Sequence, residues 1–210
     1  MEDSWQVSEP IAVARPYGAH RLEAFSPKLN RRIVLYRRQA FDLWITIESD
    51  PKVREFCERP GYIQFRGKRG LADFLVTYPD RQELVILPDP IVGGDAKPLA
   101  NLDAGDRNVR LVHAAELAAS RIWVDNWQRM LPCIVATRGL LPASLLRLVK
   151  DFVATPQPLF AIERELSKSD SILVRAAVFQ LLHEGRVTAP ELRTDTLSLS
   201  TRFSAVEAQS

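Results

Sequence analysis

The chain has no long apolar run, which excludes the simplest membrane architectures. Its 210 residues are 46% hydrophobic and 26% charged, as in ordinary globular proteins. No apolar stretch approaches the roughly 20 residues that a membrane-spanning helix needs. The first residues, Met1 to Gln6, also lack the basic and then apolar layout of a secretory signal. We therefore expect a cytoplasmic globular protein with no membrane partner.

Cysteine, histidine and the common catalytic motifs are also scarce. The two cysteines, Cys57 and Cys133, are too far apart for a metal-ligand motif, so we expect free thiols in a reducing compartment. The three histidines share no ligand spacing. The sequence has no glycine-rich phosphate loop and no Gly-x-Ser-x-Gly motif, so it lacks the usual signatures of nucleotide-binding enzymes and serine hydrolases.

Charge is nearly balanced over the whole chain, but it is unevenly distributed. There are 28 Lys and Arg against 26 Asp and Glu, a formal net charge of +2. In the segment 28–38 every charged residue is basic, and a second basic site lies at Lys68 and Arg69. The basic residues of the first segment are Lys28, Arg31, Arg32, Arg37 and Arg38. Such a patch fits a nucleic-acid phosphate backbone, and it also fits a solvated surface before a helix; both interpretations stay open.

The N-terminal two thirds of the chain predict an α+β domain. Residues 1–27 contain three prolines and a glycine, which indicates an arm with little helix. Apolar residues from Ile33 to Ile47 recur every three or four positions and predict an amphipathic helix, which ends at Asp50-Pro51 because a proline disfavours helix in the residue before it. Strands are predicted at 62–65, 72–77, 83–87 and 110–112, from their β-branched and apolar content. A helix is predicted over 114–130, and we expect Pro132 to end it.

The C-terminal third predicts a separate domain over 138–205, after a first domain over 28–137. Three helices are expected at 143–154, 158–166 and 171–184, followed by short strands at 186–188 and 197–200. Three helices and a β-hairpin are the layout of a winged helix, whose third helix normally enters the major groove of DNA. We expect that helix to bury Val174, Val178, Leu181 and Leu182. We expect it to present Ser171, Arg175, Gln180 and His183 outward.

Within this predicted domain, two side chains have the chemistry of base readers and three that of phosphate contacts. Arg175 and Gln180 are suited to base edges. Arg186, Arg193 and Arg202 on the hairpin are suited to phosphate. The domain is only weakly basic, however, and many winged helices dock proteins instead. Both partners therefore stay open for it.

Three blocks between Ile33 and Asp89 carry a resemblance to a known family. A helix-like run ends in Glu48-Ser49-Asp50-Pro51-Lys52-Val53, and Arg59-Pro60 follows it. The next blocks are Leu71-Ala72-Asp73-Phe74-Leu75-Val76 and Leu84-Val85-Ile86-Leu87-Pro88-Asp89-Pro90. In order and spacing these blocks resemble the N-terminal domain of TnsA-like transposon endonucleases, which have the PD-(D/E)XK nuclease fold. The expected C-terminal winged helix is also similar to that family's second domain.

The resemblance implies a nuclease site from which most of the chemistry is missing. The family's helix Glu falls on Ala40, or on Gln39 if the alignment slips by one residue. Its Pro-Asp pair falls on Ala72-Asp73, and its strand Glu and Lys fall on Leu87 and Asp89. No lysine occurs between Arg69 and Lys97, so no slip restores the strand motif. Because Mg²⁺ needs several oxygen ligands, we expect Asp73 to be a remnant and expect no cofactor.

The resemblance then implies a DNA-binding subunit that does not cut DNA, within a heteromeric transposase. Its partners would be DNA, the transposase and an ATPase regulator, in a nucleoid-associated bacterial setting; homo-oligomers stay open. One alternative is an active Mg²⁺ endonuclease with migrated acids at Glu48, Glu55, Asp73 and Glu83, although Glu48 and Glu55 also fit helix-end and surface acids. Another alternative is a winged-helix regulator of transcription or phage defence.

Overall fold

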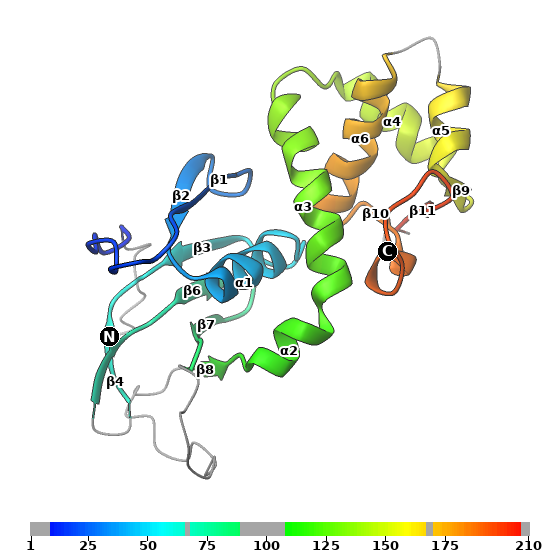
Figure 1. The fold of residues 1–210 in the computed structure, drawn as a ribbon. Coiled ribbons are helices and arrows are strands. Elements are labelled where there is room, and N and C mark those ends of the chain that lie inside the picture. The colour runs from blue at the N-terminus through cyan, green and yellow to red at the C-terminus, as the bar shows by residue number, and fades with distance from the viewer. Residues whose placement is uncertain (1–8, 66–67, 89–107, 167–169, 207–210) are drawn as a thin grey trace. The chain divides into compact units, whose positions relative to one another are not determined.

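The chain forms an α+β structure with two compact units (Figure 1). The computed structural model describes residues 9–65, 68–88, 108–166 and 170–206. Unit 1 comprises Met1–Ile47 and Lys52–Ala118, and unit 2 comprises Glu48–Pro51 and Ala119–Ser210. The chain therefore crosses between the units three times, and unit 2 contains residues 119–137 in addition to the expected 138–205.

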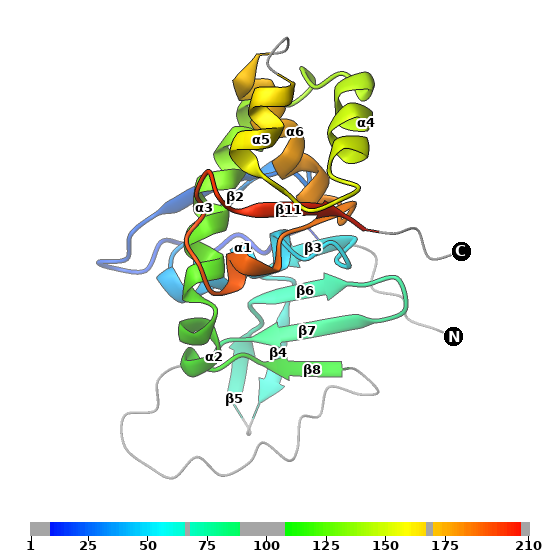
Figure 2. The same ribbon diagram turned by 90° about the vertical axis from the view of Figure 1, so that its right-hand side faces the viewer.

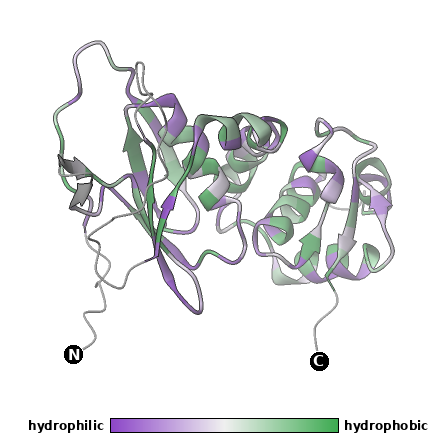
Figure 3. Cartoon of the chain, turned by 90° about the horizontal axis from the view of Figure 1, so that it is seen from below, coloured by the Kyte–Doolittle hydropathy of each residue, from purple (hydrophilic) through white to green (hydrophobic). Residues whose placement is uncertain are grey.

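Unit 1 is built on a mixed sheet of four strands in the order β3-β6-β7-β8. The strands are β3 (Glu55–Glu58), β6 (Phe74–Thr77), β7 (Gln82–Ile86) and β8 (Asn108–Leu111). The first two pairings are antiparallel and β7 pairs with β8 in parallel. The strands are rich in residues that pack well on a pleated surface, and hydrophobic residues concentrate along them in Figure 3.

Two hairpins accompany this sheet. The first joins β1 (Leu22–Ser26) to β2 (Arg31–Leu35), and the second joins β4 (Tyr62–Phe65) to β5 (Lys68–Leu71). Figure 2 shows β4 and β5 running across the direction of β6 and β7. The sequence predicted a basic turn from Gly67 to Gly70; instead Lys68 already begins the second strand of the hairpin.

The predicted helix from Ile33 begins later than expected, at α1 (Arg38–Glu48). Residues 31–35 form β2, in which Ile33 and Leu35 are buried and the other three residues are more exposed. In a segment of only five residues, the apolar positions expected for a half-buried strand largely coincide with those expected for an amphipathic helix. The apolar pattern of residues 31–35 is therefore compatible with both structures. Residues 31–35 form a strand and not a helix because they pair with β1, and this pairing satisfies their backbone hydrogen bonds.

Unit 2 combines helices with a small three-stranded sheet of order β10-β11-β9. Helix α6 contacts α3, α4 and α5, and its residues are among the most buried in the chain. The helices are α3 (Arg121–Ala136), α4 (Ala143–Phe152), α5 (Leu159–Glu165), α6 (Ser171–His183) and the 3₁₀ helix η1 (Pro190–Arg193). The strands are β9 (Gln157–Pro158), β10 (Val187–Thr188) and β11 (Arg202–Ala205), with both pairings antiparallel.

Two predictions about these elements were wrong. The helix expected over 114–130 is divided at Ser120 into α2 (Ala114–Ala119) and α3, and α3 continues through Pro132. A proline inside a helix removes one hydrogen bond, but α3 buries an apolar face on both sides of that residue. The second hairpin strand lies at Arg202–Ala205 and not at 197–200. In the described part of the chain, no helix combines the length and the apolar character that crossing a membrane requires.

Candidate functional site

Asp73 lies just before β6 and is fixed by its neighbours on both sides. Its backbone N–H donates to the carbonyl of Val85 at 3.1 Å, and its carbonyl accepts from the N–H of Arg59 at 2.9 Å. Asp73 thus continues the pairing of β6 by one residue, towards β7 through Val85 and towards the end of β3 through Arg59. The single acid that the resemblance implies is therefore held on the rigid part of unit 1.

Both carboxylate oxygens of Asp73 already have donors. Oδ2 accepts from the backbone N–H of Leu87 at 2.7 Å, and Oδ1 forms an ion pair with the guanidinium of Arg37. The Asp73 side chain is only 10% exposed. The Arg37 guanidinium therefore occupies the position beside the Asp73 carboxylate that a bound metal ion would take. A divalent ion would have to displace Arg37 in order to bind Asp73.

The other family positions supply no carboxylate or amine in the described part of the chain. Ala40 and Leu87 are apolar and buried, and Asp89 lies outside the described residues. Among the described residues, no group of three or more His, Cys, Asp or Glu could hold a metal ion. The arrangement around Asp73 is an internal ion pair and not a set of convergent ligands.

The alternative set of migrated acids is dispersed by the register of the strands. Glu55 lies opposite Thr77 and Glu83 lies opposite Val76, about three residues or roughly 10 Å along β6 from Asp73. Since Thr77 and Val76 are consecutive, the two glutamates project to opposite faces of the sheet. Glu83 is also paired with Arg81 at 2.7 Å.

Glu48, the remaining acid of that set, belongs to unit 2 and is fully buried. Its Oε1 lies 3.0 Å from Nε2 of His183, and the His183 ring packs edge-on against Trp127 with centroids 5.9 Å apart. Glu48 is the last residue of α1, as the interpretation of a helix-end acid expected, but it is buried and does not lie on the surface. Sequence spacing gave no signal for this pair, because 135 residues separate its members.

The residues that follow Glu48 are held in unit 2 by further contacts. Trp123 Nε1 donates to Ser49 Oγ at 2.9 Å. Gly185 has φ +70°, and a Cβ added there would lie 2.6 Å from Cβ of Pro51. A side chain at position 185 would therefore collide with the proline, which adds a packing reason to the conformational reason for glycine at this helix end.

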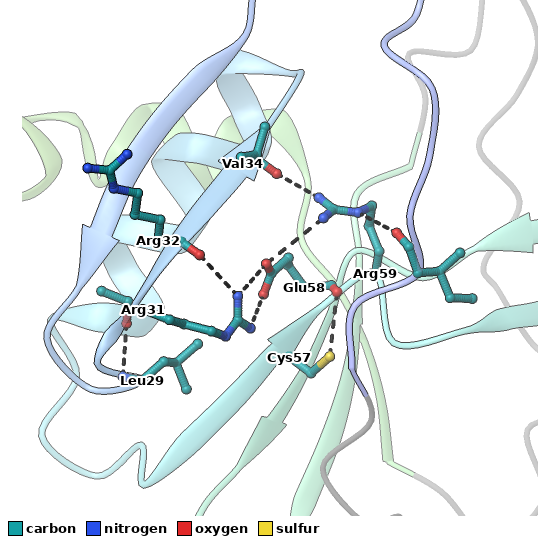
Figure 4. Close-up of polar contacts among 9 residues, drawn as sticks. Leu29, Arg31, Arg32, Val34, Cys57, Glu58 and Arg59 are labelled. Carbon is teal, nitrogen blue, oxygen red and sulfur yellow. Dashed lines mark hydrogen bonds and ion pairs between the residues drawn. The ribbon is translucent and has the colours of Figure 1, made fainter.

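Arg31, the first arginine of the basic segment, is used inside the fold (Figure 4). Its guanidinium donates to both oxygens of Glu58, at 2.7 and 2.6 Å, and Glu58 is 2% exposed. The hydrogen bond to Glu58 raises the pKa of Arg31 above its ordinary value, against desolvation, which lowers it. This forked pairing neutralises a buried carboxylate, so Arg31 has a structural role in unit 1.

Arg59 completes the same network and connects three segments. It has a left-handed backbone with φ 50°, and its guanidinium donates to the carbonyls of Ile11 at 3.0 Å and Val34 at 2.7 Å. One of its nitrogens also lies 3.9 Å from Glu58. The Arg59-Pro60 block therefore has a structural role in this chain.

The other residues of unit 1 that were predicted to contact DNA lie on β2, α1 and β5. Arg32 is exposed on β2, and the guanidinium of Arg38 pairs with Asp42 at 2.8 Å while lying over the ring of Phe41. Lys68 and Arg69 lie in β5, where their backbones pair with those of Phe65 and Gln64. The basic segment is therefore divided between Arg31, which is structural, and arginines that remain partly exposed.

Helix α6 of unit 2 presents little surface to a groove. Eight of its residues are buried, including the expected Val174, Val178, Leu181 and Leu182. His183 was expected to point outward, but it is 6% exposed. Arg175 donates to Glu163 at 2.6 Å, a bond that raises the pKa of Arg175, and Gln180 donates to Glu184 at 2.8 Å. Of the side chains expected to face outward, Ser171 and Arg175 are exposed and Gln180 is half-buried, whereas His183 is packed inside.

The arginines of the hairpin region are dispersed among different partners. Arg186 pairs with Glu184 at 3.1 Å. Arg193 in η1 lies over the ring of Trp123, with its Cζ 4.4 Å from the centroid. Arg202 is exposed on β11. Each of these arginines therefore has a different environment.

Comparison with known proteins gives no relative from which a function could be transferred. No protein-family model matches the chain, and no curated protein matches it. The geometry of the described residues is therefore the basis for the functional argument.

Proposed function

We propose that this chain is a non-cleaving, TnsA-like subunit of a heteromeric transposase, which binds transposon-end DNA and assists complex assembly. The observation that carries the proposal is the state of Asp73. Its carboxylate is occupied by Arg37 and by the N–H of Leu87. A site that hydrolyses phosphodiesters with Mg²⁺ instead needs carboxylates that converge on the ion and lower the pKa of its water.

The order of elements in each unit supports this proposal. In unit 1, α1 precedes three antiparallel strands, and β8 then adds in parallel beside β7, an arrangement compatible with a PD-(D/E)XK core. In unit 2, the order α4-β9-α5-α6-β10-β11 with β11 between β10 and β9 is compatible with a winged helix. These two orders support the proposal that the units correspond to the two domains of the resembled family.

Within the proposal, the two units have different partners. The partly exposed arginines of unit 1 and the β4–β5 hairpin are the better candidates for contact with DNA phosphate, because α6 buries eight of its residues and offers few side chains to a groove. Unit 2 then serves mainly to dock the transposase or its ATPase regulator. Burial of the helix that would enter the groove favours this assignment over sequence-specific reading by α6.

A cleavage assay tests the central claim. Purified protein is incubated with supercoiled plasmid in Mg²⁺ or Mn²⁺, beside Asp73→Ala and the control Asp80→Ala, whose carboxylate lies on an exposed turn with 68% exposure. We expect no metal-dependent nicking by any of the three proteins. Nicking that Asp73→Ala abolishes and Asp80→Ala retains would replace the proposal with the endonuclease alternative.

A further inference from the structure

Arg37 and Arg38 are consecutive, and each is held by its own carboxylate. Arg37 pairs with Asp73 before β6, whereas Arg38 pairs with Asp42 one turn further along α1. The carboxylates are covered, with side chains 10% and 15% exposed, while the arginines are 42% and 53% exposed. Each pair therefore has its acid on the protein side and its guanidinium on the solvent side.

A fixed arginine binds a phosphate with less loss of side-chain freedom than a mobile one. The guanidinium is a planar fork that matches phosphate geometry, and immobilising a long side chain on binding lowers affinity. Asp73 is itself held by the sheet and by the N–H of Leu87. Arg38 has a second support, because its Cζ lies 5.7 Å from the centroid of the Phe41 ring.

We propose that Arg37 and Arg38 contact backbone phosphates of duplex DNA and that Asp73 and Asp42 brace them for that contact. This inference rests on the proposed DNA binding and names the residues that perform it. It assigns a positive role in binding to Asp73, the acid that the nuclease resemblance treats as a remnant.

Bracing and bulk charge predict opposite effects for the removal of an acid. Asp42→Asn makes the protein more positive by one charge, so simple electrostatics would strengthen binding to DNA. If Asp42 acts as a brace, the same variant binds duplex DNA about threefold to tenfold more weakly. The matched control is Asp125→Asn, which breaks a similar pair four residues apart, Arg121 with Asp125 at 3.1 Å on α3 of unit 2. The control should bind as tightly as the original protein or more tightly.

Arginine variants give an independent readout through the salt dependence of binding. Arg37→Ala and Arg38→Ala should each reduce the slope of log affinity against log salt by about 1, as loss of one phosphate contact predicts. Arg121→Ala, from the control pair, should leave the slope unchanged. Arg38→Lys keeps the charge and loses the fork, so we expect it to weaken binding while retaining most of the slope. Thermal melting of each variant identifies any loss of folding.

The outcomes separate this inference from the proposed function. If the original protein does not bind duplex DNA at any salt concentration, both are overturned. If it binds, but Asp42→Asn binds more tightly and the Arg37→Ala and Arg38→Ala slopes do not change, only the bracing inference fails. Inorganic phosphate at matched ionic strength should not displace the duplex more than chloride does. Displacement by phosphate alone would assign the arginines to a free phosphate ion and overturn the inference.

Discussion

Among the described residues, each unit buries one glutamate, and the two glutamates have different partners. In unit 1, Glu58 is 2% exposed and is held by a forked arginine, Arg31, that reaches it from β2. In unit 2, Glu48 is fully buried, and its Oε1 lies 3.0 Å from the imidazole Nε2 of His183. A guanidinium is a planar fork that meets both oxygens of a carboxylate, whereas one imidazole nitrogen meets a single oxygen. Neither carboxylate belongs to a group of metal ligands among the described residues, so burial of an acid is a structural feature here.

The sharpest test of this comparison is removal of the arginine. Arg31→Ala leaves Glu58 buried without its main cation. Because the Arg31 side chain is 36% exposed and solvent screens the pair, we expect a loss of about 2–4 kcal/mol, below the upper end for a fully buried pair. We expect this loss in the global unfolding of unit 1, measured by denaturation and by hydrogen exchange in β3 and β6. The neighbouring Arg32→Ala is the control; because Arg32 is exposed, we expect a change of no more than about 0.5 kcal/mol.

The pH dependence follows from the raised pKa of Arg31. A group whose folded pKa is raised stabilises the protein at all pH values below its unfolded pKa, and this stabilisation is lost only as the pH rises through the folded value. For an arginine, the pH range in which this stabilisation is lost lies far above neutrality. The difference between the original protein and Arg31→Ala should therefore stay constant from about pH 6 to 9, and a difference that disappears within that range would contradict the assignment.

A smaller effect is expected from the corresponding change in unit 2. Glu48→Gln keeps the shape of the side chain and removes the charge from its bond to His183. Hydrogen bonds to charged groups contribute about 1.5–3 kcal/mol, so we expect a loss in that range, read from hydrogen exchange in α6. Glu165→Gln, at the exposed end of α5, is the control and should have almost no effect. A loss as large as that of Arg31→Ala would show that the two units depend equally on their pairs.

The smallest effect at neutral pH concerns the two thiols, one in each unit. Burial, which desolvates the thiolate, raises the pKa of Cys57 from 9.0 to about 11, whereas Cys133 is partly exposed. At pH 8 an alkylating reagent should therefore modify Cys133 in the folded protein much faster than Cys57, as mass spectrometry of peptides would show. Rapid labelling of both thiols would mean that unit 1 opens readily.

The raised pKa of Cys57 also predicts how the stability of unit 1 depends on pH. Because the folded pKa of Cys57 is raised, its contribution is fully present below pH 9 and is lost as the pH rises towards about 11. Cys57→Ala should remove this alkaline component from the unfolding of unit 1, and Cys133→Ala should not.

Local sequence patterns predicted many of the elements correctly. The strands at β4, β6 and β7, the helices α4, α5 and α6, and the turn at Tyr78–Arg81 lie close to their predicted positions. Each has a strong local signal: alternation or apolar content in the strands, and helical spacing in the helices. The predictions that were wrong had competing signals, as in residues 31–35 and at Pro132, where pairing or packing with distant residues decided the outcome.

The site shows the same division. The sequence identified Asp73 as the one acid kept at a family position, but it gave no indication that Arg37 would neutralise it. It also grouped Arg31 with the exposed arginines, because nothing local distinguishes an arginine that faces solvent from one that reaches a glutamate 27 residues away. His183 was expected outward for a similar reason, since the position of Glu48 was not known.

By itself, the amino-acid sequence determined the residue types available to each unit, most of the helices and strands, and the absence of a lysine between Arg69 and Lys97. The tertiary structure alone decided which charges meet: Arg31 with Glu58, Arg37 with Asp73, and His183 with Glu48. The physical reason is that secondary structure follows from neighbours along the chain, whereas a buried carboxylate must find a partner wherever the fold places one.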